Sequence, residues 1–251
     1  MFNDYDDQIS ISFINLEKRK ERLLGVRENL SEMHYDLKKI NTFRAIENRF
    51  GEIGCASSHK ILCTELLKNS KAKYHLIFED DFRFAVPLVT IKKIISLFEE
   101  KEIDFDFFNL YGEWPVAIKR NKVFFQQKPY FLYRLFNSYT TGCYLIPKHF
   151  LQDMINHFEF CERKLRKQLK KLQEKGFEER FRSFTTKDET FRIFIANHYS
   201  IDQYWRNLMV DSVFIGLNYV FGYTEPYESD VESRPEFQKK LEFIKKISDL
   251  T

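Results

Sequence analysis

The sequence has few cysteines, glycines and prolines, and therefore lacks the cysteine content of a disulfide-rich secreted protein or a small zinc-binding domain. Its 251 residues include only 4 cysteines, 8 glycines and 6 prolines. The cysteines are scattered and form no C-x-x-C pair, which indicates buried thiols of a reducing compartment, with a disulfide as the alternative. The first ten residues are acidic and polar, unlike a signal peptide, and no apolar run approaches the roughly 20 residues that span a bilayer. These absences predict a cytoplasmic protein without a signal peptide or transmembrane segment.

Other absences narrow the choice of chemistry. No Ser-His-Asp order, zinc-ligand spacing or glycine-rich phosphate loop is present, which argues against triad hydrolases, zinc enzymes and P-loop ATPases. The 40 basic and 37 acidic residues give a net charge of +3, too balanced to indicate a nucleic-acid partner. With 43% hydrophobic and 31% charged residues the composition is globular, and residues 1–251 are predicted to form one domain.

Apolar runs of strand length alternate with stretches of helical periodicity. This order predicts an α/β fold with a Rossmann-like, mainly parallel sheet flanked by helices. Ligands of such sheets bind at the carboxyl ends of the strands, where Asn15, Asp80, Asp81 and Tyr111-Gly112 fall. Strands are predicted at 9–16, 36–44, 74–78, 105–110 and 143–146, and helices at 17–33, 57–68, 89–102 and 149–158.

A basic helical insertion is predicted at 155–185, and a C-terminal amphipathic helix at 236–251. Within 162–175 there are seven basic and two acidic residues beside a near-heptad leucine stripe. A stretch of this kind suits an anionic membrane surface, at which the protein would be peripheral, or else a dimer contact or an acceptor contact. The simpler interpretation, which we favour, is a solvated hairpin packed by its leucines.

Three carboxylates, Glu79, Asp80 and Asp81, follow the buried strand at 74–78. In an extended chain Glu79 and Asp81 would point to one side and Asp80 to the other. Two hard oxygen ligands at a strand end suit Mg²⁺ or Mn²⁺, which could also hold a diphosphate. The alternative is a set of surface acids that cap the next helix.

Four further residues have a chemical and a structural interpretation. Arg19 and Arg22 follow the first strand and suit phosphates or a carboxylate, or else an ordinary solvated helix. His59 lies near a helix start, where anions bind, although a lone histidine there is more often a structural hydrogen-bonding group. Asp202 could be a general base or a helix cap.

Taken together, ordered segments of the chain resemble glycosyltransferase family 25, which includes bacterial lipooligosaccharide and collagen hydroxylysine galactosyltransferases. The two longest of these segments have nine residues each, and the resemblance runs from about Ile9 to Arg234. The segments are FINL at 13–16 with Arg19 and Arg22, FRAI at 43–46, GEIGCASSH at 51–59, LIFEDDFRF at 76–84, DFDF at 104–107 with Tyr111-Gly112, TGCYLI at 141–146, Ile201-Asp202 and SDVES at 229–233.

The resemblance implies a GT-A fold and an inverting transfer from a UDP-hexose, galactose or glucose, to a glycan, glycolipid or glycoprotein. Glu79 and Asp81 would hold Mn²⁺ or Mg²⁺ on the donor diphosphate, and Asp202 is the first candidate for the base. The residues implied in donor binding are Asn15, Arg19, Arg22, Ala45, Ser58, His59, Asp80, Tyr111 and Gly112.

One departure from the family pattern keeps other functions open. The collagen branch follows its late aspartate with glutamate, and Gln203 stands there in this chain. If that glutamate is the base, the chain is a non-catalytic nucleotide-sugar or glycan-binding module on the same fold. A metal-dependent phosphoesterase is a further alternative, although it would usually need a second set of metal ligands.

Overall fold

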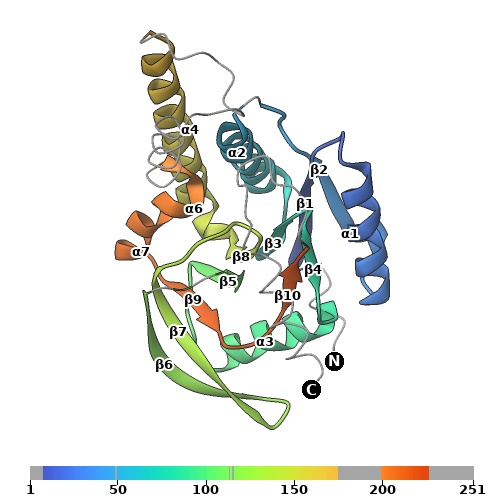
Figure 1. Ribbon diagram of the computed structural model, residues 1–251. Coiled ribbons are helices and arrows are strands. Elements are labelled where there is room, and N and C mark those ends of the chain that lie inside the picture. Colours follow the sequence, from blue (N-terminus) through green and yellow to red (C-terminus); the bar gives the residue numbers. More distant parts are fainter. Residues whose placement is uncertain (1–7, 49, 113, 115, 175–198, 226–251) are drawn as a thin grey trace.

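A large sheet and a small one form the framework of the protein. The computed structural model describes residues 8–48, 50–112, 114, 116–174 and 199–225. The large sheet has eight strands in the order β2-β1-β3-β8-β5-β9-β7-β6, and the small one pairs β4 with β10 (Figure 1). The strands are β1 Ile9–Asn15, β2 Ile40–Arg44, β3 Tyr74–Glu79, β4 Phe82–Phe84, β5 Phe107–Tyr111, β6 Val116–Phe125, β7 Lys128–Asn137, β8 Cys143–Pro147, β9 Phe214–Leu217 and β10 Gly222–Thr224.

The large sheet is mixed in direction. The pairs β1–β2, β1–β3 and β5–β9 are parallel, whereas β3–β8, β5–β8, β6–β7 and β7–β9 are antiparallel. The predicted α/β class is confirmed and the architecture is GT-A-like. The antiparallel share arises because β8 runs backwards between β3 and β5, and because a hairpin, β6–β7, extends the sheet.

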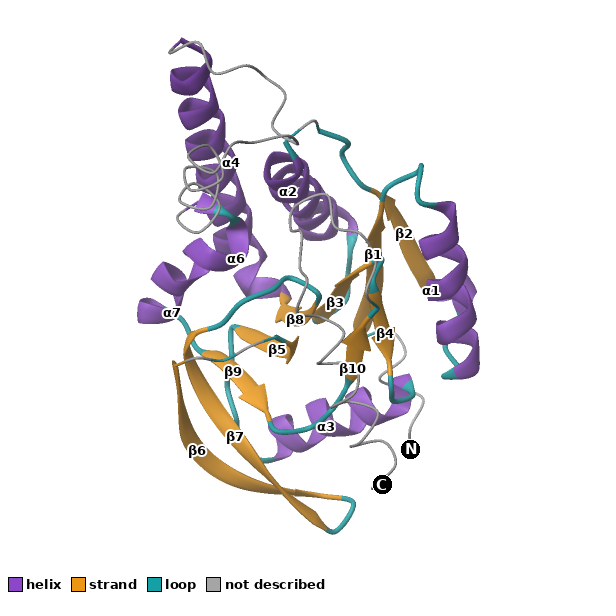
Figure 2. Cartoon of the chain, viewed as in Figure 1, coloured by secondary structure: helices purple, strands orange, loops and turns teal. Residues whose placement is uncertain are grey.

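Helices cover both faces of the sheet (Figure 2). Alternating side chains of one strand reach opposite faces: Leu76 and Phe78 pack with α1 and α3, and Ile77 packs with α2 and α4. These buried aliphatic and aromatic side chains drive the layers together. The helices are α1 Lys20–Glu32, α2 Gly51–Asn69, α3 Leu88–Glu100, α4 Leu151–Glu174, α6 Ile201–Tyr204 and α7 Leu208–Asp211.

One edge of the sheet collects the chain segments that carry the predicted chemistry. The parallel strands β1, β2 and β3 end there at Asn15, Arg44 and Glu79. Strand β8 begins there, because Cys143 is paired with Phe78 on one side and with Tyr111 on the other. The segments after β1, β3 and β5, which the sequence predicts at strand ends, therefore lie at one edge, together with the segment after β2 and the segment before β8.

The acidic triplet is not extended. Glu79 ends β3, Asp80 and Asp81 form a turn, and β4 begins at Phe82. The argument that residues i and i+2 share a side is therefore wrong here, because it holds only along a strand.

The basic stretch belongs to a long helix rather than to a separate hairpin arm. Phe158, Cys161 and Leu165 are fully buried, and α4 packs along α2. The first part of the predicted insertion thus contributes to the core. Residues 175–198, the motif at 229–233 and the helix predicted at 236–251 lie outside the described residues. Within the described part, no helix is long and apolar enough to cross a bilayer.

Candidate active site

Glu79 is held at the end of β3 by side chains from two other elements. Its Oε1 accepts hydrogen bonds from His59 Nε2, at 3.2 Å, and from the Thr141 hydroxyl, and Cys55 Sγ lies 4.0 Å away. Burial would raise the pKa of Glu79, but the hydrogen bonds and charge of His59, with help from Thr141 and Arg19, outweigh it and hold this pKa below its usual value.

The fold explains why these side chains meet. Cys55 and His59 are four residues apart, so they share the face of α2 that lies on the sheet. Thr141 directly precedes β8, which pairs with β3, and the Glu79 amide donates to the Gly142 carbonyl at 3.0 Å. The ring of His59 is oriented from its other side by the Tyr144 hydroxyl, 2.7 Å from Nδ1. Because Nε2 donates to Glu79, a neutral His59 accepts at Nδ1 from Tyr144.

Asp80 points to a different set of partners. Its Oδ1 lies 2.8 Å from Arg22 Nη1 and 3.7 Å from Arg19 Nη1. Burial raises the pKa of Asp80, although both arginines act to lower it. The predicted donor-binding residues Asp80, Arg19 and Arg22 therefore form one buried ion cluster, in which the arginines neutralise the carboxylate.

Asp81 is the carboxylate that best fits a bound cation. Its Oδ1 is buried and has no hydrogen-bond partner among the described residues. Burial, together with the negative charges of Glu79 and Asp80, raises the pKa of Asp81 to about 7. A buried, unpaired carboxylate oxygen that feels the charges of two other acids is stabilised by a divalent cation, so the residues present fit the Mn²⁺ or Mg²⁺ that the resemblance implies.

The turn that carries Asp80 and Asp81 is fixed by an arginine without a predicted role. Arg83 is buried and donates to the carbonyls of Asp80, at 3.0 Å, and of Phe82, at 2.9 Å. It also pairs with Glu225 at 2.9 Å, whose amide donates to the Asp81 carbonyl at 2.8 Å. The motif LIFEDDFRF contains Arg83, but no local signal reveals Glu225, which is 142 residues away.

Asp202 lies across the same edge, at the start of α6. Its Oδ2 accepts the Thr140 amide at 3.0 Å. Thr140 has a φ of 73°, a left-handed conformation that is strained for a threonine, and its hydroxyl donates to the Tyr111 carbonyl at 3.3 Å. Asp202 therefore helps to hold the loop whose next residue, Thr141, contacts Glu79.

Two predicted donor-binding residues lie beside this loop. Tyr111 Oη is 2.8 Å from Thr224 Oγ1, which ties β5 to β10. A Cβ atom at Gly112 would lie 2.5 Å from the Tyr139 carbonyl, so only glycine allows this close approach.

The other three predicted residues tie β1, β2 and α2 together. The Ala45 amide donates to the Asn15 carbonyl at 2.8 Å. Ser58 Oγ accepts the Ile46 amide at 2.8 Å and donates to the Gly54 carbonyl at 2.6 Å. Asn15 keeps a buried Oδ1 without a partner among the described residues.

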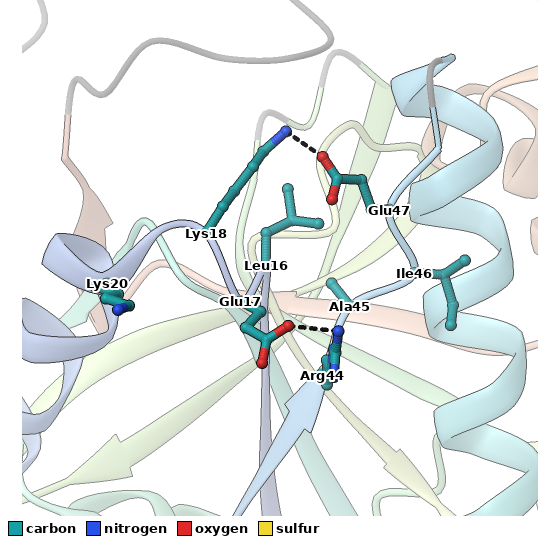
Figure 3. A pocket seen from close by; sticks show the side chains of 8 residues that line it. All are labelled: Leu16, Glu17, Lys18, Lys20, Arg44, Ala45, Ile46 and Glu47. Carbon is teal, nitrogen blue, oxygen red and sulfur yellow. Dashed lines mark hydrogen bonds and ion pairs between the residues drawn. The ribbon is translucent and has the colours of Figure 1, made fainter.

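A pocket of about 540 Å³ opens at the ends of β1 and β2 (Figure 3). Two ion pairs line it: Lys18 with Glu47, at 2.6 Å, and Arg44 with Glu17. Of the residues predicted to bind the donor, Ala45 lines this pocket. The lining consists of Leu16, Glu17, Lys18, Lys20, Arg44, Ala45, Ile46 and Glu47.

Comparison with known proteins identifies the family of the chain. The model of glycosyltransferase family 25 (LPS biosynthesis protein) matches residues 31–166, which is more than half of the chain. The match spans Cys55, His59, Glu79 and Thr141. The chain therefore belongs to glycosyltransferase family 25, as its motifs predict. No curated protein matches the sequence.

Proposed function

We propose that the protein transfers galactose or glucose from a UDP-sugar, with inversion, to a hydroxyl group of a glycan, a lipid-linked glycan or a glycoprotein. The observation that carries the proposal is the Asp81 carboxylate near Glu79, whose buried Oδ1 has no hydrogen-bond partner among the described residues, at the edge where ligands of α/β sheets bind. Family membership supports a glycosyltransferase in general. The family's description as an LPS biosynthesis protein favours a lipid-linked acceptor.

Glu79 and Asp81 would hold Mn²⁺ or Mg²⁺. When bound, the cation neutralises the charge that builds up on the leaving diphosphate. Cys55, His59 and Glu79 offer a sulfur, a nitrogen and an oxygen atom that all lie within 4.8 Å of one another. Sulfur and imidazole ligands suit Zn²⁺ better than Mg²⁺ or Mn²⁺. We therefore assign Cys55 and His59 to orienting Glu79, and the carboxylates to the cation.

The two arginines would act on the donor in different ways. The Arg22 side chain is 5% exposed and makes the shorter contact to Asp80, whereas that of Arg19 is 16% exposed and stands 3.7 Å away. Arg19 is thus better placed to turn towards a diphosphate, and Arg22 to orient Asp80. The pocket beside Ala45 would take the nucleoside.

Asp202 would accept the proton of the acceptor hydroxyl. The Thr140 amide orients its carboxylate, and the adjacent Thr141 hydroxyl orients Glu79. One loop therefore sets the relative positions of the proposed base and the proposed cation ligand, as an in-line displacement requires.

The test is the release of UDP from a panel of UDP-sugars, with and without Mn²⁺ or Mg²⁺. We expect slow, metal-dependent hydrolysis of one donor by the wild type and by Asp153→Asn, an exposed matched control on α4, and its loss in Asp81→Asn. Release of UMP or phosphate instead of UDP would indicate a phosphoesterase. Metal-dependent binding of a donor without turnover, even with acceptor glycans present, would indicate a binding module.

A further inference from the structure

The β6–β7 hairpin, Val116–Asn137, has a net positive charge larger than that of the whole chain. It contains five basic residues and no acidic one. Since the full chain has a net charge of +3, the rest of the sequence sums to −2. The hairpin forms the outer edge of the large sheet and projects beyond α3 (Figure 1). Its basic residues are Lys119, Arg120, Lys122, Lys128 and Arg134.

The two faces of the distal half of the hairpin differ in what they contact. On the inner face Val123 and Phe125 are buried and join the core beside α3. On the outer face the register pairs Lys122 with Phe131 and places Phe124 next to them. Phe124 is 58% exposed. The inner face thus anchors the hairpin and leaves the outer face to solvent.

Lysines and aromatic rings are interleaved on this outer face. Lys119 Nζ lies 3.1 Å from the centre of the Phe131 ring, and Lys122 Nζ lies 5.1 Å from that of Phe124. Ile118, which is 54% exposed, is paired with Arg134 and lies on the other face of the hairpin. An exposed aromatic side chain among lysines, without acids, is typical of surfaces that lie in the headgroup region of anionic membranes.

We propose that the outer face of this hairpin docks on an anionic lipid bilayer, with Phe124 at the boundary of headgroups and acyl chains and the lysines on lipid phosphates. Charge complementarity carries the choice of occupant, because Lys119 and Lys122 lie on this face and the hairpin contains no acid, so the face attracts a negative surface; Arg134 instead donates to the Met209 carbonyl. Strand addition by another protein is disfavoured, since lysines along an edge strand oppose it.

Docking of the hairpin would place the candidate active site close to the membrane surface. Strand β6 begins shortly after Gly112, and β7 ends directly before the loop that contains Thr140 and Thr141. Both ends of the hairpin therefore join the candidate active site. Docking would bring this edge of the sheet to the surface that carries a lipid-linked acceptor. The access to a lipid-linked acceptor rests on the proposed function, whereas the docking itself does not.

The test uses the full-length protein and vesicles of phosphatidylcholine with and without phosphatidylglycerol. We expect co-sedimentation with the anionic vesicles only, weakened by salt. Lys119→Gln/Lys122→Gln should lower the partition coefficient roughly thirty-fold. Lys167→Gln/Lys171→Gln, an equal loss of charge on exposed positions of α4, should leave it nearly unchanged. Equal losses in the two variants, or a loss in the α4 variant alone, would overturn the proposal.

A tryptophan probe reports insertion independently of charge. Phe124→Trp should show a blue-shifted emission with anionic vesicles and quenching by brominated acyl chains. Val210→Trp, at a 75% exposed position of α7, is the matched control and should show neither change. No change in Phe124→Trp, or an equal response to RNA, would contradict membrane docking. UDP release without lipid should persist in all these variants, so failure of the docking and failure of the proposed transfer are distinguishable.

Discussion

The Asp81 carboxylate has one buried oxygen, Oδ1, without a hydrogen-bond partner among the described residues, and it feels the negative charges of Glu79 and Asp80, which costs free energy when no cation is bound. Its folded-state pKa of about 7 lies above the unfolded value of about 3.9. The folded state therefore holds a proton that the unfolded state releases, and this residue lowers stability progressively as the pH rises from 4 to 7.

Asp81→Asn should accordingly raise the melting temperature of the metal-free protein. The gain in unfolding free energy is expected to be greatest above pH 7, where it reaches up to a few kcal/mol, and to vanish near pH 4. Added Mn²⁺ should raise the melting temperature of the wild type but not that of Asp81→Asn. Thermal denaturation at pH 4, 6 and 8 measures both effects, and a gain that does not vary with pH would contradict the account.

Asp202 is assigned two tasks, proton acceptance and support of the loop at Thr140, and two substitutions separate them. Asp202→Asn keeps an oxygen for the Thr140 amide, so we expect an unchanged melting temperature and a kcat about 10²- to 10⁴-fold lower. Asp202→Ala should lose the loop contact as well and melt at a lower temperature. Steady-state kinetics with a true acceptor measure the first effect, and a kcat near the wild-type value in Asp202→Asn would remove Asp202 as the base.

Local sequence could identify the chemistry of single residues but not their partners. The acidic triplet is visible because it interrupts an apolar run, whereas Cys55 lies outside the helix predicted at 57–68 and its place beside His59 is not predicted. The pairing of Asp80 with Arg22 joins residues 58 positions apart, and no local pattern encodes that distance.

At the scale of elements, the helix that contains the basic stretch is also part of the core. Leu165 is fully buried and packs with Phe50 and Ile53. Leu165→Ala should therefore cost about 2–4 kcal/mol of unfolding free energy. Leu24→Ala, on α1 and 58% exposed, is the control and should cost less than about 0.5 kcal/mol. Urea denaturation measures both free-energy costs. Similarly small costs for the two substitutions would contradict a core role for this part of α4.

Elements with regular periodicity could be predicted from sequence, and irregular ones could not. β1 alternates apolar residues with serine at its start, β3 and β8 are mostly apolar runs, and α3 has a clear apolar face. The β6–β7 hairpin escapes prediction because its register shifts between Lys119 and Lys122, which breaks the two-residue alternation. The N-terminal turns of α2 contain two glycines, Gly51 and Gly54, which hide the true start of that helix.

Two buried histidines contribute to how the stability of the whole molecule responds to acid. Burial lowers the pKa of His75 and of His157 to about 4. Both rings are neutral in the folded state, whereas the unfolded chain takes up protons below about pH 6.5. Their contribution to stability is complete above that pH and is lost as the pH falls towards 4, by up to about 2.7 kcal/mol per pH unit for the pair.

His75→Gln/His157→Gln should therefore be less stable at pH 7 but lose less stability between pH 6.5 and 4. His34→Gln, at an exposed position, should follow the wild-type curve. Urea midpoints across this pH range measure the slopes, and parallel curves for all three proteins would contradict the assignment.

The most direct test of the central claim, that the Asp81 edge of the sheet binds a UDP-sugar with a divalent cation, is a calorimetric titration. UDP, UDP-galactose and UDP-glucose would be titrated into the wild type, Asp81→Asn and the control Asp153→Asn, with Mn²⁺ and with EDTA. The account predicts Mn²⁺-dependent binding to the wild type and the control, and at least a tenfold weaker affinity in Asp81→Asn. Binding that is equal in all three proteins, or absent in all with every nucleotide, would contradict it.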